Sequence, residues 1–181
     1  MINNIKEILV SEEEINEIVT RIAAQINEDY KDKNLLLVCI LKGSVCFMAD
    51  LMKQIKLPCV IDFMVAKSYY AGTESKGEIK IYKDLDIDIS NYDVLIIEDI
   101  FDSGRTLDLL VKKLKERNPR SLECCSLLDK PDRRDPNINL ELKYTGKAVP
   151  DEFVVGYGLD YDEVYRNLPF VGVLKREVYE G

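Results

Sequence analysis

The chain has 181 residues, of which 46% are hydrophobic and 32% are charged, and its net charge at pH 7 is −8. This length suffices for one globular domain with its own core, and the negative overall field disfavours binding to nucleic acid or anionic lipid. The sequence has no histidine and five cysteines without a CxxC pair, which excludes an imidazole base and argues against a zinc site or a disulfide framework.

The hydrophobic residues are spread over many short runs, and none approaches the ~20 consecutive apolar residues of a membrane span. Residues 1–10 mix polar and charged side chains and lack the basic region and apolar block of a secretory signal. We therefore expect a protein of the reducing cytoplasm that has neither a membrane nor a nucleic acid as a partner.

The first predicted elements are a helix and a buried strand. Ser11 followed by Glu14 forms a capping box, and the apolar stripe that continues to Ile26 predicts an amphipathic helix. Residues 35–41 form a continuous apolar run, which is typical of a strand covered on both faces. A second helical pattern starts after the polar turn at 42–44.

The middle of the chain contains three further strand patterns and one long polar segment. A β-rich stretch at 59–66 comes first. Residues 67–78 are polar, glycine-bearing and non-periodic, so we interpret them as a mobile loop. This loop leads into a short strand at 79–82, and residues 94–97 predict a buried strand that ends at acidic residues. A helical pattern follows at 107–114.

The alternation of strands and helices continues through residues 122–128, a predicted strand that ends at Asp129-Lys130-Pro131. Strands that alternate with amphipathic helices indicate βαβ crossovers and a parallel sheet covered by helices. From residue 137 onward the pattern is less regular, with strand-like segments at 153–157 and 171–174. We predict one compact α/β domain over residues 1–181.

The segment after residues 94–97 is the most informative, because ligands of parallel sheets bind beyond the carboxyl ends of the strands. Two carboxylates, Glu98 and Asp99, follow the apolar run directly, and residues 102–106 (DSGRT) lead into a helix. Small hydroxyl residues and a glycine at a helix start expose backbone N–H groups that can bind a phosphate. The alternative is that Asp102 or Ser103 only caps the helix. The combination favours a sugar phosphate.

The run VLIIEDIFDSGRTL at 94–107 resembles the signature with which type I phosphoribosyltransferases bind 5-phosphoribosyl-1-diphosphate (PRPP). In the same order along the chain, LKGS, SYY, DK and the stretch 153–175 resemble the hypoxanthine-guanine branch of that family. The resemblance implies the type I fold: a parallel central sheet flanked by helices. The core would span about 35–135, and a small hood would come from about 1–10 and 136–181.

The resemblance also implies a reaction. A 6-oxopurine, hypoxanthine or guanine, would attack C1 of PRPP and release diphosphate, giving IMP or GMP in purine salvage. Mg²⁺ is expected as the cofactor, because PRPP is strongly anionic and the motif supplies several carboxylates against few cations. Members of the family are commonly dimers or tetramers, so we expect a homo-oligomer.

By this resemblance, each motif residue takes a role. Asp102 is the candidate general base for the purine proton. The 5-phosphate and ribose are assigned to Glu98, Asp99, Asp102, Ser103, Gly104, Arg105 and Thr106. The diphosphate is assigned to Lys42, Gly43 and Arg166, next to a Leu41-Lys42 peptide that is often cis in the family. The purine is assigned to Lys130, Phe153, Val154 and Asp160, the lid to Ser68 and Tyr69, and the metal to Glu98, Asp99 and Asp160.

Several assignments have a structural alternative. Lys130 is also compatible with an exposed strand end, Phe153 with ordinary core, and Arg166 with the surface. Two other classes of protein share part of this pattern. A signalling receiver domain carries its acidic pair after the first strand, whereas here the pair lies in mid-chain. A PRPP-sensing regulator of nucleotide genes shares the fold, but the net charge and the lack of spare N-terminal length argue against it.

Overall fold

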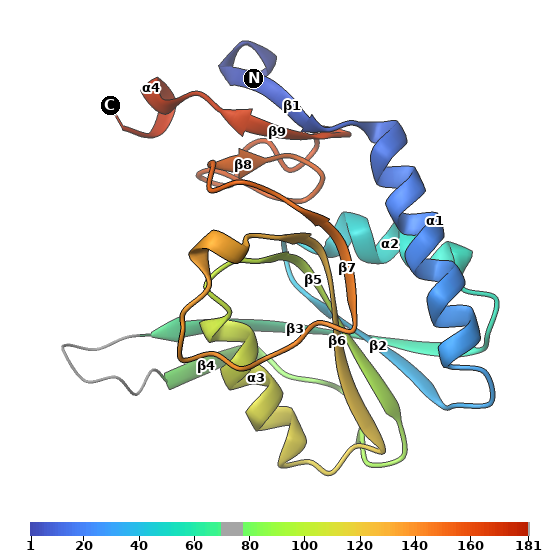
Figure 1. Cartoon of the computed structure of the whole chain (residues 1–181). Coiled ribbons are helices and arrows are strands. Elements are labelled where there is room, and N and C mark those ends of the chain that lie inside the picture. The colour runs from blue at the N-terminus through green and yellow to red at the C-terminus, as the bar shows by residue number, and fades with distance from the viewer. Residues whose placement is uncertain (70–77, 181) are drawn as a thin grey trace.

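The computed structural model describes residues 1–69 and 78–180, and in this part of the chain the strands form two sheets (Figure 1). The larger sheet has six strands in the order β4-β3-β2-β5-β6-β7, and the smaller has three in the order β1-β9-β8. The large sheet comprises β2 (Leu35–Ile40), β3 (Cys59–Tyr69), β4 (Glu78–Lys83), β5 (Asp93–Phe101), β6 (Ser121–Asp129) and β7 (Tyr144–Ala148). The small sheet comprises β1 (Ile5–Val10), β8 (Val154–Val155) and β9 (Val171–Leu174).

Four α-helices and two 3-10 turns complete the described elements. The helices are α1 (Glu12–Asp29), α2 (Val45–Gln54), α3 (Arg105–Lys115) and α4 (Arg176–Tyr179), and the turns are η1 (Ile2–Asn4) and η2 (Pro131–Arg133). The predicted helix start at Ser11 is confirmed, because the Ser11 side chain accepts a hydrogen bond from the Glu14 N–H at 3.2 Å, whereas the Glu14 carboxylate pairs with Lys147. No described helix has the length and apolar character that crossing a membrane requires.

Helices cover both faces of the large sheet, and the sequence of β2 shows why. All six of its residues are buried, and alternate side chains point to opposite faces. Leu35, Leu37 and Cys39 pack with α1 and α2, whereas Leu36, Val38 and Ile40 pack with α3. Strands β2, β3, β5, β6 and β7 are parallel, and β4 is antiparallel to β3 at the edge. The predicted α/β fold with a mostly parallel central sheet is therefore confirmed.

Strand β5 is longer than the apolar run that predicted it. It continues through Phe101 because β6 keeps pairing with it, up to the pair Phe101 and Asp129. Glu98 and Asp99 therefore lie within the strand and not on the loop after it. In the same way β3 continues to Tyr69, three residues into the predicted loop 67–78, and β4 starts at the last residue of that loop, Glu78. Residues 70–77 lie outside the described residues.

Strand β7 was not predicted, because its short sequence YTGKA has little apolar character. A Cβ atom on its central Gly146 would lie 2.1 Å from the carbonyl oxygen of Leu127, so the close approach of the two backbones requires glycine. Since β7 belongs to the large sheet, the core continues past the predicted boundary near 135. After β1, the chain returns to the small sheet only beyond Ala148.

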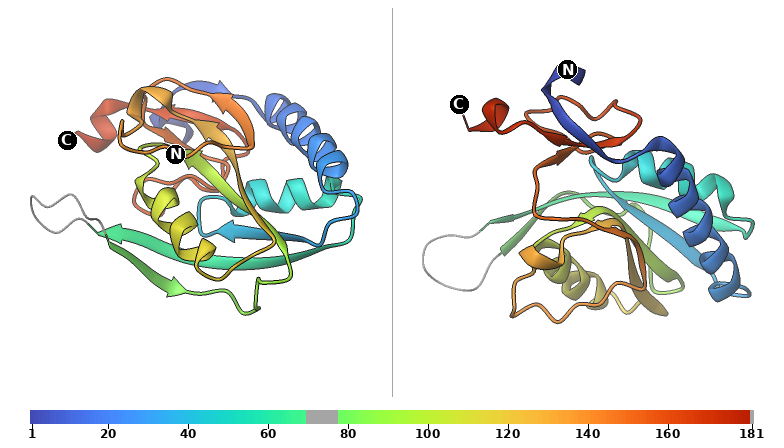
Figure 2. Two further views of the ribbon diagram at one scale, coloured as in Figure 1. Left: turned by 60° about the horizontal axis from the view of Figure 1, so that its bottom comes forward. Right: turned by 45° about the horizontal axis from the view of Figure 1, so that its top comes forward.

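The small sheet forms a hood, which we define as β1, β8, β9, α4 and the loops between them. Figure 1 and the right-hand view of Figure 2 show the hood above the carboxyl end of β5 in the large sheet. Strand β1 pairs with β9 in antiparallel fashion, so segments from both ends of the described chain build it together. A separate buried cluster of Val155, Tyr165, Leu168 and Leu174 fills its interior.

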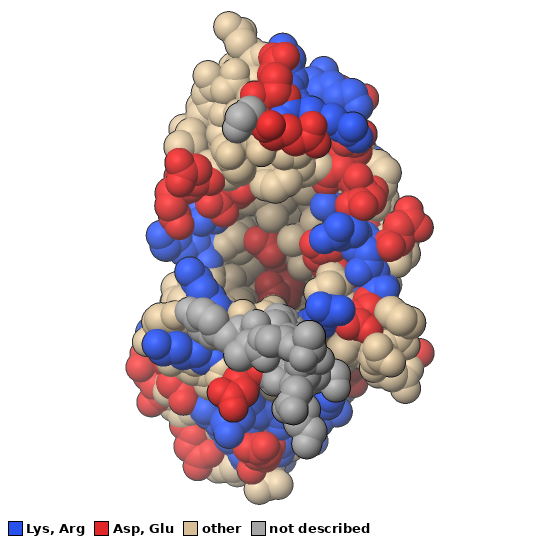
Figure 3. All heavy atoms as spheres, turned by 90° about the vertical axis from the view of Figure 1, so that its left-hand side faces the viewer, with Lys and Arg blue, Asp and Glu red and all other residues tan. Residues whose placement is uncertain are grey.

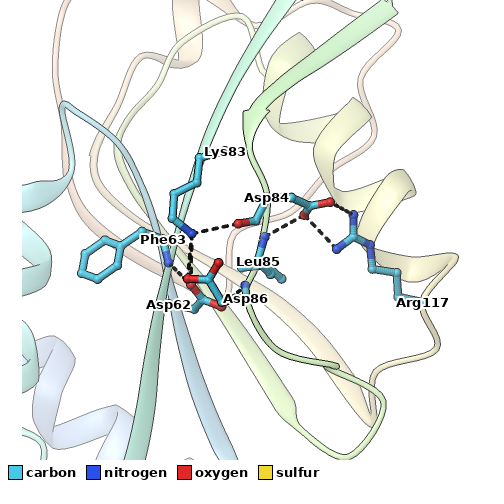
Figure 4. A network of polar contacts seen from close by, with 7 residues as sticks. All are labelled: Asp62, Phe63, Lys83, Asp84, Leu85, Asp86 and Arg117. Carbon is cyan, nitrogen blue, oxygen red and sulfur yellow. Dashed lines mark hydrogen bonds and ion pairs between the residues drawn. The ribbon is translucent and has the colours of Figure 1, made fainter.

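A polar network fixes the segment after β4 against the sheet (Figure 4). The buried carboxylate of Asp62 accepts hydrogen bonds from the backbone N–H groups of Phe63 (2.7 Å) and Asp86 (2.8 Å). Asp84 then forms a bidentate pair with Arg117, at 2.9 and 2.8 Å. The network ties β3 to the segment that leads toward β5, and β3 carries Ser68 at its far end.

Candidate active site

A cleft separates the hood from the large sheet. In Figure 3 it is a deep hollow with acidic side chains at its floor and Lys and Arg side chains on both rims. The sheet side contains a pocket of about 220 Å³. Its lining comes from the turn after β2, the end of β5 and the start of α3, and includes Gly43, Glu98, Asp99, Asp102, Ser103, Gly104 and Thr106. The structure therefore brings most of the predicted PRPP residues together.

The turn before α3 has the geometry that a phosphate site needs. Gly104 precedes the helix with φ 82°, a left-handed conformation that favours glycine. A Cβ atom there would also lie 2.9 Å from the ring of Phe101. The first N–H groups of a helix have no partner within it, so this turn can present them, with the hydroxyl groups of Ser103 and Thr106, to an anion. The Arg105 side chain, in contrast, pairs with Asp135.

The acidic pair on β5 lies half-buried at the bottom of the pocket. Burial raises the pKa of Glu98 well above its ordinary value, and the neighbouring Asp99 charge adds to the effect. Burial also raises the pKa of Asp99, although the N–H of Ile100 donates to its carboxylate at 2.6 Å. Two carboxylates with raised pKa values side by side form a site that favours cationic or hydroxyl-bearing ligands.

This pair is expected to lower the stability of the ligand-free protein. Glu98 has a higher pKa in the folded than in the unfolded state, so stability falls as the pH rises from the ordinary carboxyl pKa up to the raised pKa of the folded state. Glu98→Gln should therefore increase the free energy of unfolding at pH 7 and flatten its dependence on pH. Urea titrations at pH 5 and pH 7 measure this. Glu17→Gln, on the exposed face of α1, is the control, and no gain at pH 7 would contradict the prediction.

The turn after β2 is fitted tightly between β5 and the hood. The Leu41-Lys42 peptide is cis. A Cβ atom on Gly43 would lie 1.5 Å from Oδ2 of Asp99, and a Cβ atom on Gly158 would lie 2.0 Å from the carbonyl oxygen of Gly43. Three segments that are distant in the sequence therefore meet through two glycines and one carboxylate.

Gly43→Ala is expected to destabilise the protein and to impair the site, since the turn must move away from Asp99. Overpacking of this kind costs about 1 to 3 kcal/mol. Thermal or urea unfolding measures the loss. Lys42→Ala is the neighbouring control: its side chain is 64% exposed and pairs with Glu163, so the free energy of unfolding should change by less than about 1 kcal/mol. Equal effects of the two substitutions would contradict the steric explanation.

The two predicted diphosphate cations, Arg166 of the hood and Lys42 of the turn after β2, are paired with acids. Arg166 contacts Asp160 at 2.9 Å and Glu163 at 3.4 Å, and it donates to the carbonyl oxygen of Gly158 at 2.8 Å. Lys42 contacts the same Glu163 at 2.8 Å. Arg166 is three-quarters buried, so the alternative of an ordinary surface residue is not supported.

The predicted purine residues gather where the hood meets the end of β6. Lys130 is buried, and its ammonium group donates to the carbonyl oxygen of Glu152 at 2.7 Å, so it is not an exposed strand-end lysine. Phe153, the next residue, is 37% exposed, which distinguishes it from ordinary core; Val154 is buried. Ser68 of the predicted lid meets Thr106 of the phosphate turn, with the hydroxyl oxygens 2.8 Å apart.

Arg134 connects the two halves of the site, although no local pattern distinguishes it among the charged residues at 132–135. Its guanidinium donates to the carbonyl oxygen of Asp102 at 2.9 Å, pairs with Asp129 and lies 3.1 Å from the centre of the Phe101 ring. The residue thus ties the phosphate turn to the strand end that carries Lys130. The neighbouring Arg133 contacts the Asp102 carboxylate at 3.3 Å.

Comparison of the sequence with known proteins places the chain in a family. Residues 7–162 match the model of the phosphoribosyl transferase domain. A hypoxanthine-guanine phosphoribosyltransferase of Staphylococcus epidermidis is 56% identical over 179 residues, with 99% of each chain covered. The chain belongs to the hypoxanthine-guanine phosphoribosyltransferase family.

Solved structures agree with this family assignment. A hypoxanthine phosphoribosyltransferase of Staphylococcus aureus superposes with a TM-score of 0.95 at 54% identity, over 100% of this chain and 97% of that one. The enzyme of Trypanosoma cruzi, solved as a ternary substrates complex, gives 0.91 at 36% identity, over 98% and 99% of the two chains. In this phosphoribosyltransferase the domain match contains the whole large sheet, whereas β9 and α4 lie beyond it.

The carboxylates of this phosphoribosyltransferase site determine which kind of metal ion it can bind. No three Asp, Glu or Cys residues among those described form a cage for a metal. Asp160 lies close enough to Asp99 for its charge to raise the pKa of that residue, but both Asp160 oxygens already have protein partners, Arg166 and the N–H of Glu163. The site therefore fits an ion held by one or two carboxylates and completed by substrate and water oxygens, which is the habit of Mg²⁺.

Proposed function

We propose that this protein joins hypoxanthine or guanine to PRPP and releases diphosphate, giving IMP or GMP for purine salvage. The observation that carries the proposal is that one pocket is lined both by Asp102, Ser103, Gly104 and Thr106, at the start of α3, and by Glu98 and Asp99. A phosphate on the turn would place a ribose within reach of these carboxylates. The names of the relatives supply the purine specificity.

Asp102 is the proposed general base. The attacking purine nitrogen loses a proton as the bond to C1 of the ribose forms, and a carboxylate at the mouth of the phosphate turn is suited to take it. Arg133 contacts the Asp102 carboxylate, and the Arg134 guanidinium donates to the Asp102 carbonyl oxygen, so the two arginines hold Asp102 in place. As diphosphate departs, positive charge develops on the ribose, and the carboxylates of Glu98 and Asp99 stabilise it.

Purine recognition is assigned to the residues around the end of β6. The Lys130 ammonium group, already fixed by the Glu152 carbonyl, would donate to the oxygen at purine C6. Adenine presents an amino group there and would leave the buried lysine without its acceptor. Phe153 would stack on the base, the Val154 main chain would contact its edge, and Asp160 would lie near it.

The diphosphate is assigned to the turn after β2 and to Arg166 of the hood. Lys42, Gly43 and Arg166 would hold it, and Ser68 and Tyr69 would belong to the lid that excludes water. Glu98, Asp99 and Asp160 are the carboxylates that would hold a Mg²⁺ ion, with most of its ligands coming from PRPP and water. When bound, the ion would neutralise and orient the diphosphate leaving group.

The domain organisation, the cellular location and the oligomeric state extend the proposed function. We propose that residues 1–181 act as one phosphoribosyltransferase domain, in which sheet and hood share the site, and that the protein works in the cytoplasm as a homodimer or homotetramer. Size-exclusion chromatography with light scattering measures the oligomeric state. A mass equal to one 20.8 kDa chain would exclude both assemblies.

Initial rates test the activity directly. The purified protein is incubated with PRPP, Mg²⁺ and, in separate reactions, hypoxanthine, guanine, xanthine or adenine, and nucleotide formation is followed. We expect IMP and GMP to form, adenine to react far more slowly, and the rates to fall when EDTA removes the metal. Binding of PRPP without any nucleotide product would instead support a non-catalytic PRPP sensor.

A further inference from the structure

Phe153 has a second aromatic ring behind it. Its ring stacks on that of Tyr179, with centroids 4.9 Å apart and planes 25° from parallel. Tyr161 meets the same ring edge-on, at 5.6 Å and 88°. One face of Phe153 is therefore covered by Tyr179, and a planar ligand that stacks on Phe153 must use the other face.

The two tyrosines are anchored in the hood. Both pack against the buried hood cluster of Val155, Tyr165, Leu168 and Leu174. The Phe153 side chain reaches out from this support and is 37% exposed, and its backbone is fixed because the N–H of Leu174 donates to its carbonyl oxygen at 2.8 Å. Phe153 is thus held by ring contacts to the hood and not by burial in the core.

We propose that Tyr179 is a positioning residue for purine binding, which holds the Phe153 ring at the angle and height at which it receives the base. The purine, Phe153 and Tyr179 would form a stack of three planar groups, with Tyr161 limiting rotation of the middle ring. The Lys130 ammonium group donates to the carbonyl oxygen of Glu152, the residue before Phe153. The position of the ammonium group is therefore fixed relative to the plane of the Phe153 ring. This inference rests on the proposed purine transferase activity.

The sequence position of Tyr179 makes the inference independent of the family motifs. Tyr179 ends α4, beyond residues 7–162 of the domain match. A ring–ring contact of this kind contributes about 0.5 to 1.5 kcal/mol, so a stacked ligand should lose about two- to tenfold in affinity when the backing ring is removed. Its effect should be confined to the base, because the described contacts of Tyr179 lie on the purine side of the site.

Steady-state kinetics of the full-length protein test this. Tyr179→Leu keeps an apolar side chain but removes the ring, and we expect the KM for hypoxanthine to rise about two- to tenfold, with the KM for PRPP and kcat unchanged. Tyr179→Phe keeps the ring and should have the wild-type KM. Val178→Ala, in the same helix and packed on the same hood cluster, should lower the Tm and leave the KM for hypoxanthine unchanged.

The outcomes separate the possible roles of Tyr179. An unchanged KM for hypoxanthine in Tyr179→Leu would overturn the proposal. So would a lower KM, which would mean that Tyr179 occupies the base position and competes with the purine. The proposal would also be overturned if Tyr179→Leu raised the KM for both substrates and lowered the Tm as much as Val178→Ala does. Tyr179 would then be a purely structural residue. A wild-type protein without any transferase activity would refute the proposed function itself, which the wild-type rates reveal first.

Discussion

Asp102→Asn is expected to fold normally and to lose about 100- to 10,000-fold in kcat, the usual contribution of a general base. Asparagine has nearly the same shape, and it preserves the hydrogen bond that the Arg134 guanidinium donates to the backbone carbonyl oxygen of residue 102. It cannot take the proton that the purine loses. The PRPP site should therefore stay intact while the chemical step slows.

The experiment combines steady-state rates with PRPP binding. Asp151→Asn is the matched control, because Asp151 is the other acid that contacts Nε of Arg133, at 3.8 Å compared with 3.3 Å for Asp102. The control should keep wild-type turnover, and both variants should keep the wild-type Tm within a few degrees. Unchanged kcat in Asp102→Asn would remove Asp102 from proton transfer.

Lys130→Ala is expected to change which base the enzyme prefers. A hydrogen bond from a charged group contributes about 1.5 to 3 kcal/mol, so the preference for hypoxanthine over adenine in kcat/KM should fall by about 10- to 100-fold. The substitution also removes the donor to the Glu152 carbonyl. Part of the loss will therefore appear as weaker binding of every base, and the ratio between bases isolates the 6-oxo contact.

A lysine on the neighbouring strand provides the control for charge alone. Lys147 of β7 pairs with Glu14 at 2.6 Å, so Lys147→Ala removes an equal charge without touching the proposed base site. Its preference among bases should equal that of the wild type. If Lys130→Ala retains the wild-type preference for hypoxanthine over adenine, Lys130 does not read the 6-oxo group.

The sequence predicted the buried strands and the turn at the start of α3 well, because both depend on local patterns. Apolar runs such as 35–41 identify strands covered on both faces, and the residues of the turn 102–106 are those that a helix start with exposed N–H groups requires. The ends of the elements were less predictable. Whether Glu98 and Asp99 belong to β5 or to a loop depends on pairing with β6, which no local pattern contains.

Contacts between segments that are distant in the chain could not be predicted from the sequence. Arg134 is one of several charges in its stretch, and only the fold shows that it binds Asp102, Asp129 and Phe101 together. The same holds for Tyr179, which is 26 positions from Phe153 (179 − 153) and gives no local sign of its contact. Burial of Lys130 is also a tertiary property, because lysine beside a proline is ordinarily exposed.

The pairing of β1 with β9 has a consequence for synthesis on the ribosome. The six strands of the large sheet emerge before residue 149, so this sheet can collapse while the chain is still being made. Strand β1 must wait unpaired until Val171–Leu174 leaves the exit tunnel, more than 160 residues after its own appearance. A nascent chain would thus carry the pocket at the end of β5 before the hood covers it, and the two sides of the cleft would come together only after β9 has been translated.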